Sequence, residues 1–364
     1  MNGAFEAARA AAITAATGHP DDDVGEVRRE PLEYDAFLAH RSVHRLRGDV
    51  RHAEGPGGWS MIEKTTEGPH LASPYLRDNA EREHAAYTSG LLEHLAPGLR
   101  APRLLGAHEG VDGRLTLWLE DVEDEASRPL EAGALLATAH DLGALAGRHL
   151  ESVPEAPRLF TGWITRHAQD SASAEGLRTL GSARPETAAR LGHRIDEVRR
   201  LILAQPRLRA MLEQLPQTLC HHDAVGANLL RSGGSTVLID WESVGPGPAG
   251  ADLASLLFAS VRRGDASAQV VLPLVEDAVS AYLDGMAGQR AGVDAAGVRR
   301  GVRAAICLRW KLAVDVVRTL ETGEPAHRGS APDEAPEQAL EELLQLAGLL
   351  LDTARRVLGD GEDA

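Results

Sequence analysis

The chain has 364 residues, of which 43% are hydrophobic and 25% are charged, so its length suits two domains or one two-lobed domain and its composition excludes a disordered chain. The formal net charge of −16 argues against nonspecific binding to nucleic acid or to an anionic membrane, and is compatible with a cationic ligand. Two cysteines, Cys220 and Cys307, form no disulfide framework, which favours a reducing, cytoplasmic location.

The first third of the chain predicts a small antiparallel sheet that carries one helix. Residues 1–23 are rich in alanine, carry Glu6 and Arg9 and lack a basic leader region, so they predict a helix rather than a signal peptide. Alternating apolar residues between Gly- and Pro-containing segments predict strands, at 26–34, 42–51, 59–67 and, as a pair joined by the turn EGVDG, within 102–122. A helix is predicted at 79–95.

Beyond about residue 121 the pattern changes to helices. They are predicted at 131–150, 185–205, 249–263 and 301–320, and in a last amphipathic segment from Leu340 to Leu351. Residues 322–336 read as a loop, and Pro206 is expected to end the second of these helices. No apolar run approaches the length needed to span a membrane. We therefore expect an α+β protein with a sheet-rich N-terminal lobe, residues 1–120, and a mainly helical C-terminal lobe, residues 121–364.

The segment HHDAVGANLLRSGGSTVLIDWE, residues 221–242, interrupts these helices with a predicted strand–turn–strand hairpin. If Arg231 pairs with Thr236, Asn228 falls opposite Ile239 and beside Asp240. An amide carbonyl beside a carboxylate is a hard-oxygen site that suits Mg²⁺. Asp223, on the preceding loop, is close enough to accept a proton from a hydroxyl that attacks a metal-bound phosphate. The alternative is that Asp223 and Asn228 are turn residues and that Asp240 merely ends a strand.

The pattern His221-x-Asp223-x₄-Asn228, followed by Ile-Asp240-Trp-Glu, resembles the signature of the aminoglycoside phosphotransferase and choline kinase-like superfamily, which are small-molecule kinases with a protein-kinase-like fold. The resemblance implies that Asp223 is the catalytic base, that Asn228 and Asp240 bind Mg²⁺, and that ATP or GTP donates the phosphate. It also implies supporting roles for His221, which would hold the loop, and for Asp252 in GADLA, which would brace it.

A kinase-like lobe also needs a strand lysine that binds the nucleotide phosphates and a helix glutamate that orients it. Lys64 lies on the predicted strand 59–67 and is one of two lysines in the chain. Glu83 shares a helix face with Tyr87 and Leu91, which predicts that it points inward. An inward glutamate needs a cationic partner, and Lys64 is the available one. The alternatives are a solvated lysine and a glutamate at the edge of the helix.

The sequence departs from the kinase pattern in the loop that covers the phosphates. No glycine lies between the first two predicted strands, whereas residues 48–58 contain four. Either a turn near Ser42 serves this purpose, or the strand register is wrong. The nucleobase is expected at the lobe junction near residues 117–122.

Several alternatives remain for the function. A metal hydrolase built on His221, His222 and Asp223 lacks further ligands at recognisable spacing. The second hypothesis is a pseudokinase that binds nucleotide without catalysis. The expected partner is a small-molecule acceptor with a hydroxyl group: first an antibiotic, so that the enzyme confers resistance, then choline-like or sugar metabolites. A protein substrate is not expected, because little chain separates Asp240 from the next helix.

Overall fold

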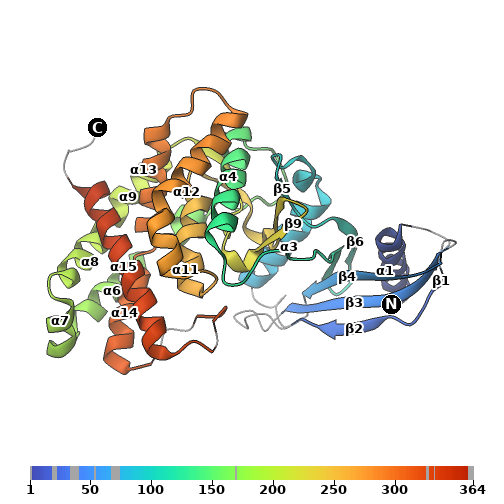
Figure 1. Cartoon of the computed structure of the whole chain (residues 1–364), viewed down its shortest axis with the longest axis horizontal. Coiled ribbons are helices and arrows are strands. Elements are labelled where there is room, and N and C mark those ends of the chain that lie inside the picture. The colour runs from blue at the N-terminus through green and yellow to red at the C-terminus, as the bar shows by residue number, and fades with distance from the viewer. Residues whose placement is uncertain are drawn as a thin grey trace.

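The computed structural model of the chain describes residues 2–18, 23–32, 41–52, 55–66, 74–168, 170–324, 328–331 and 333–359. A strand-rich N-terminal lobe lies at one end of the molecule and a larger assembly of helices at the other, with α3 and a short hairpin between them (Figure 1). The α+β, two-lobed prediction is therefore confirmed.

The N-terminal sheet is antiparallel, with the order β1–β3–β4–β7–β6, and β2 also pairs with β3. Its strands are β1 (Asp23–Val24), β2 (Arg28–Pro31), β3 (Arg41–His52), β4 (Gly55–Thr66), β6 (Leu104–Glu109) and β7 (Leu115–Glu120). The predicted strands at 42–51, 59–67 and within 102–122 are confirmed. The predicted strand 26–34 is shorter, because β2 spans four residues, and residues 33–40 lie outside the described part of the chain.

The two faces of the sheet pack against different partners, because successive side chains of a strand point to opposite faces. On one face Leu46, Met61 and Trp118 form a small core with Ala12 of α1 (Asn2–Thr17), the predicted N-terminal helix. Lys64 of β4 lies on the other face, where it meets α3 (Pro74–Thr88). The alternation along β4 thus aims the lysine at the second lobe.

Helix α3 ends earlier than the sequence predicted. The apolar spacing suggested one helix through Leu95, but α3 stops at Thr88, and Gly90 has a φ of 78° before the short turn η2 (Leu91–His94). Glycine adopts this left-handed conformation without steric cost, so it ends the helix although the apolar spacing continues.

The second lobe is mainly helical. Its helices are α4 (Ala132–Arg148), α5 (Trp163–His167), α6 (Asp170–Gly181), α7 (Pro185–Leu191), α8 (Arg194–Leu203), α9 (Gln205–Glu213), α10 (Ala251–Ala254), the π-helical turn η5 (Ser255–Ala259), α11 (Ser260–Arg263), α12 (Ala268–Gln289), α13 (Ala295–Cys307), α14 (Lys311–Thr322) and α15 (Pro336–Leu358).

Two predicted helices are divided in the structure. The segment 185–205 is broken at Gly192, whose φ is 56°, and Pro206 lies in the first turn of α9 instead of ending a helix. The segment 301–320 is split between α13 and α14 by the turn 308–310. In both places the apolar periodicity continues across the break, because the successive helices pack on the same core.

Residues 217–248, between the lobes, contain four short strands. The hairpin of β9 (Leu229–Ser232) and β10 (Ser235–Leu238) pairs Arg231 with Thr236, as predicted, and β10 also pairs in parallel with β5 (Leu99–Arg100). Strands β8 (Gln217–Cys220) and β11 (Gly245–Pro248) form a second antiparallel pair. The two short sheets fix both ends of the segment that carries the predicted site.

Cys220 and Cys307 are both buried free thiols in the core of the helical lobe. Among the described residues, no helix combines the length and hydrophobicity needed to cross a membrane.

Candidate active site

The loop after β8 is held by the buried carboxylate of Asp252 in α10. The backbone N–H groups of His221 and His222 donate to its two oxygens, Oδ2 and Oδ1, each at 2.7 Å. His222 has a φ of 67°, a left-handed conformation that a histidine adopts rarely, and these paired bonds hold it there. The bracing position predicted for Asp252 is thus the one that it occupies.

His221 links the same loop to the end of the hairpin. Its Nε2 lies 3.0 Å from the carbonyl oxygen of Ile239, and the Asp223 N–H donates to its Nδ1 at 3.2 Å. The second bond requires Nδ1 to be an acceptor, so Nε2 carries the proton and donates to Ile239. Burial lowers the pKa of His221, which keeps the ring neutral and suited to this bridging role.

Asp223 and Asn228 form a direct pair. Asn228 Nδ2 donates to Asp223 Oδ2 at 2.8 Å and to the Asp223 carbonyl oxygen at 3.0 Å. Because the amide nitrogen makes these bonds, the amide oxygen is the atom left for a cation. Burial and the charge of Asp240 raise the pKa of Asp223, whereas Arg263 and Arg309 lower it.

Close packing around this loop depends on Gly226. Its N–H donates to Ser260 Oγ at 2.9 Å, and a Cβ atom at this position would lie 2.4 Å from Asp265 Cβ. Only a residue without a side chain allows this approach. The interrupted helix α10–η5–α11 therefore supports the loop from behind at two points, Asp252 and Ser260.

Lys64 connects three segments that are distant in sequence. Its Nζ donates to Glu83 Oε1 of α3 at 2.7 Å and to Asp240 Oδ1 at 2.8 Å. The predicted pair of Lys64 and Glu83 is present, with the Glu83 side chain almost fully buried. Asp240 follows β10 with a φ of 64°, which turns the chain so that its carboxylate meets the lysine.

Three further residues that the sequence analysis did not assign hold α3 against the hairpin. Asn79 Nδ2 donates to Glu242 Oε1 at 2.9 Å, and Arg82 Nε donates to the Glu242 carbonyl oxygen at 2.9 Å. Asn79 precedes Glu83 by one helical turn, so the same face of α3 meets both η4 (Trp241–Ser243) and the lysine. The spacing of Asn79 and Glu83 could have indicated that Asn79 also points inward. It could not have identified the partner of Asn79, because Glu242 is 163 residues away in the sequence.

The glycine-rich run 48–58 lies at the wrong end of the β3–β4 hairpin to cover phosphates at Lys64. Lys64 pairs with Val43, whereas Gly48 pairs with Trp59, five residues along β4 and so about 16 Å away at about 3.3 Å per residue. Gly48 is required locally, since a Cβ there would lie 2.8 Å from the Trp59 ring. Ser42 is the second residue of β3 and pairs with Thr65, next to Lys64, and residues 33–40 before the strand lie outside the described chain.

Potential metal ligands also meet behind the loop. Within the described chain, one atom each of Cys220, His222 and Asp252 lies within 4.8 Å of the others, all buried. Both Asp252 oxygens already accept backbone hydrogen bonds, and burial lowers the pKa of His222 to about 3 and raises that of Cys220. The group has no opening to solvent for a catalytic water, so it gives no support to the hydrolase alternative.

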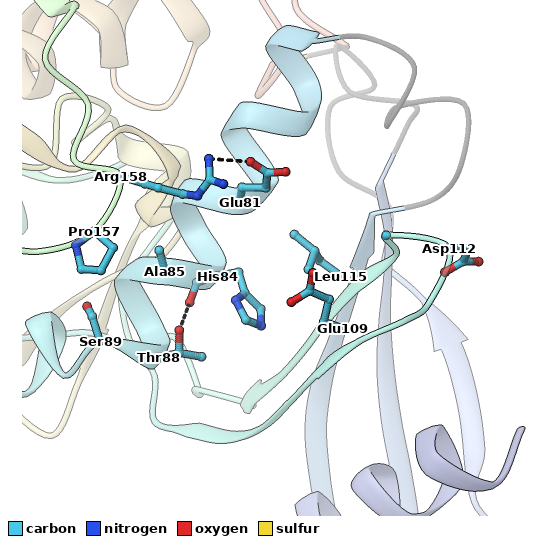
Figure 2. A pocket seen from close by; sticks show the side chains of 11 residues that line it. Glu81, His84, Ala85, Thr88, Ser89, Glu109, Asp112, Leu115, Pro157 and Arg158 are labelled. Carbon is cyan, nitrogen blue, oxygen red and sulfur yellow. Dashed lines mark hydrogen bonds and ion pairs between the residues drawn. The ribbon is translucent and has the colours of Figure 1, made fainter. Parts of the chain in front are cut away.

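A pocket of about 510 Å³ lies on the opposite face of α3 from Glu83. Figure 2 shows His84 and Thr88 of α3 facing Glu109 and Leu115 of the β6–β7 hairpin across it. At its rim Arg158 forms an ion pair with Glu81 at 2.6 Å. Because Lys64, Asp223 and Asp240 do not line this pocket, it is separate from the candidate active site.

Comparisons with known proteins identify a family and a fold. A family model described as the phosphotransferase enzyme family matches residues 69–291, more than half of the chain. A search of curated proteins found no match.

Among solved structures, choline kinase from Cryptosporidium parvum Iowa II is similar over 92% of both chains, with 11% identity and a TM-score of 0.52. Amicoumacin kinase hAmiN, in complex with AMP-PNP, Ca²⁺ and Ami, aligns with 89% of this chain and 88% of its own, at 14% identity and a TM-score of 0.48. The GDP complex of aminoglycoside 2′-phosphotransferase-IIIa aligns over 93% and 97%, at 14% identity and a TM-score of 0.46.

The choline kinase comparison shows a protein-kinase-like fold, and the family match covers the segment that holds Glu83, Asp223, Asn228 and Asp240. The chain therefore belongs to the phosphotransferase enzyme family, the small-molecule kinases that transfer phosphate to hydroxyl groups.

Proposed function

We propose that the protein is a Mg²⁺-dependent O-phosphotransferase that moves the γ-phosphoryl group of ATP or GTP to a hydroxyl group of a small molecule. The observation that supports this most is the convergence of separate segments on one place. The pair of Lys64 and Glu83, the carboxylate of Asp240, and the pair of Asp223 and Asn228 come from β4, α3, the end of β10 and the loop after β8. We propose residues 1–120 as the nucleotide-binding lobe and 121–364 as the catalytic and acceptor-binding lobe.

In this proposal Lys64, positioned by Glu83, binds the nucleotide phosphates. The oxygens of Asn228 and Asp240 fit Mg²⁺, since both are hard ligands on adjoining parts of the hairpin. The ion, when bound, neutralises charge on the phosphates. Asp223 accepts the proton of the acceptor hydroxyl, and its raised pKa makes it a stronger base than an exposed aspartate. His221 and Asp252 keep the loop in place without contacting the reactants.

The acceptor classes that we propose are hydroxyl-bearing antibiotics first, in which case the reaction would confer resistance, and choline-like or sugar metabolites second. Solved kinases of similar fold act on amicoumacin, aminoglycosides and choline according to their descriptions. A location in the cytoplasm, where ATP and GTP are available, is part of the same proposal.

The test is transfer of labelled phosphate from ATP and from GTP, with and without Mg²⁺, to a panel of antibiotics, choline and sugars. Asp223→Asn should reduce kcat by at least about a hundredfold while leaving nucleotide binding intact, because proton transfer by a positioned base contributes roughly 10²–10⁴-fold. The matched control is Asp277→Asn on the exposed surface of α12, which should leave the rate unchanged.

Nucleotide binding without transfer to any acceptor would favour the pseudokinase. A protein that fails to bind ATP and GTP at all would contradict both hypotheses, whereas equal rates for Asp223→Asn and the parent would remove Asp223 from the mechanism.

A further inference from the structure

Two arginines lie on the helical-lobe side of the proposed base. Arg263 is the last residue of α11, and Arg309 lies in the turn between α13 and α14. The positive charges of both lower the pKa of Asp223, which places them in its electrostatic surroundings. Neither forms an ion pair with Asp223 within 4.0 Å in the described chain, so both are near the carboxylate without neutralising it by contact.

Within the described chain, one side-chain hydrogen bond holds Arg309 beside the catalytic loop. Its Nη2 donates a short hydrogen bond to Ser255 Oγ in the π-helical turn. Ser255 follows Asp252 by three residues, and Asp252 holds the backbone of the catalytic loop from the same helical face. Arg309 therefore binds the helix one turn after Asp252, the residue that holds the loop on which Asp223 lies.

The guanidinium of Arg309 has more donors than partners. Its Nε is buried and makes no hydrogen bond, and no carboxylate in the described chain forms an ion pair with it. Burial lowers the pKa of Arg309 to about 10, although the charge of Asp223 opposes this effect. A guanidinium offers five N–H donors in a planar fork, a geometry that matches a carboxylate or a phosphate. A desolvated cation with open donors is a site for an anion.

Further positive groups lie in the region of Arg309, together with the carboxylates of Asp223 and Asp252. The charges of Arg309, Arg166 and Lys311 all lower the pKa of His167, whose ring packs on Trp163 near the loop. Lys311 is exposed at the start of α14. Arg263 forms an ion pair with the buried carboxylate of Asp265, with 3.7 Å between Nε and the carboxylate oxygen. Positive groups from α5 and α14 thus act on the same ring as Arg309.

We propose that the acceptor carries an anionic group, a carboxylate or a phosphate, beside the hydroxyl that is phosphorylated, and that Arg309, assisted by Arg263, binds this group. The inference rests on the proposed function and narrows its acceptor. With the anion held by Arg309, the hydroxyl lies toward Asp223. The acceptor oxygen then bonds to the γ-phosphorus, its proton passes to the Asp223 carboxylate, and the β–γ bridging oxygen leaves on the nucleoside diphosphate with the bonding electron pair.

This assignment disfavours choline and polycationic aminoglycosides, since the charge of Arg309, which no carboxylate of the described chain pairs with, repels an ammonium group.

The first test measures anion binding without nucleotide or Mg²⁺, so that it does not depend on catalysis. Malonate and inorganic phosphate are titrated separately by calorimetry into the full-length protein, which distinguishes a carboxylate site from a phosphate site. Arg309→Gln should weaken binding of the preferred anion about tenfold or more, and Arg309→Lys should restore part of it. Arg263→Gln should weaken it less, and Arg299→Gln, a change to a partly exposed arginine of α13 that is paired with Glu276, should have no effect.

The second test compares three matched acceptors, glucuronic acid, glucose and glucosamine, together with glucose 6-phosphate. The expected result is the lowest KM for an acidic compound, with Arg309→Gln raising that KM at least tenfold while kcat changes less than twofold. Anion binding that is insensitive to Arg309→Gln overturns the inference, as does transfer to glucosamine or choline that this variant leaves unchanged. Binding at Arg309 without any phosphate transfer would support the site and contradict the proposed function instead.

Discussion

At the scale of single residues, Asp223 has opposing requirements for catalysis and for stability. A base must be ionised, yet burial and Asp240 disfavour its charge and raise its pKa. Arg263 and Arg309 moderate this effect from a distance, and Asn228 donates to one carboxylate oxygen. The ionised form of Asp223, which is the form that can act as a base, therefore lowers the stability of the folded protein. Such a trade-off between activity and stability is common in active sites.

This balance predicts that Asp223→Asn is more stable than the parent at pH 7.5. The folded-state pKa of Asp223 lies above its unfolded value, so the folded protein binds the proton more tightly, and stability is lost as pH rises through the raised pKa. A neutral asparagine avoids that loss. The melting temperatures of the variant and the parent, compared at pH 7.5 and pH 4.5, should differ more at the higher pH.

Asp277→Asn, an exposed change of the same kind, should show no such pH dependence. A variant that is less stable than the parent by the same amount at both pH values would mean that the hydrogen bonds of Asp223 outweigh its desolvation.

The sequence identified candidate site residues where their spacing along a single hairpin or helix was informative. Spacing along the hairpin placed Asn228 opposite Ile239, the residue before Asp240, and helix periodicity selected Glu83 as the partner of Lys64. Arg309 could not be found in this way, because it is far from Asp223 in the sequence and acts on it only in the folded chain. Arginine is also the common basic residue of this chain, so its type gave no signal.

At the scale of elements, α1 covers the face of the N-terminal sheet that points away from the candidate site. Phe5 packs on Trp118 with ring centroids 5.3 Å apart, and Ala12 is fully buried against the sheet. A Cβ atom on Gly106 of β6 would lie 2.9 Å from Ala12 Cβ, so helix and strand meet through their smallest residues. The sequence predicted the helix but not its position, since an alanine-rich stripe does not specify a partner.

This contact predicts that Ala12→Leu destabilises the protein. Three further carbon atoms cannot be accommodated against the strand backbone, and overpacking of this kind costs about 1–3 kcal/mol of unfolding free energy. Ala15→Leu, an exposed position on the same helix, should change it by less than about 0.5 kcal/mol. Urea unfolding of both variants measures the difference, and equal stabilities would show that α1 contributes nothing to the sheet.

The divided helices show where element prediction fails. Gly90 and Gly192 end helices through positive φ angles, while the apolar stripes on either side stay in phase. The periodicity of apolar residues indicates which face of a helix is buried. It does not indicate helix length, because a common core can bury two short helices as well as one long helix. The fold class was predictable because it depends on which residues are buried, whereas the helix boundaries depend on the backbone angle of single residues.

At the scale of the whole molecule, neutral histidines join the catalytic loop to the helical lobe. Burial lowers the pKa of His167, His221 and His222, that of His222 to about 3. His222 stacks on Trp163 at 5.4 Å, and its Nε2 lies 3.1 Å from the Pro246 carbonyl oxygen. The catalytic loop, α5 and β11 therefore share one desolvated cluster of side chains. Protonation of a histidine ring in this cluster requires that the packing around the ring open.

Acid should accordingly destabilise the entire fold before the carboxylates titrate. An unfolded histidine binds a proton near pH 6.5, whereas His222 in the folded state does not until about pH 3. The unfolded state thus binds more protons across this window, and stability is present above pH 6.5 and lost as pH falls below it. Between pH 6.5 and 5 the loss from His222 alone is about 2 kcal/mol, at about 1.36 kcal/mol per pH unit.

The decisive comparison is the change in melting temperature between pH 7.5 and pH 5 for three proteins. The parent and His193→Gln, which alters an exposed histidine, should lose the same amount, whereas His222→Gln should lose less whatever its stability at pH 7.5. If His222→Gln loses as much as the parent, protonation of His222 does not control acid unfolding. The cluster would then hold the loop through packing and hydrogen bonds that tolerate a charged ring, contrary to the desolvation that its burial implies.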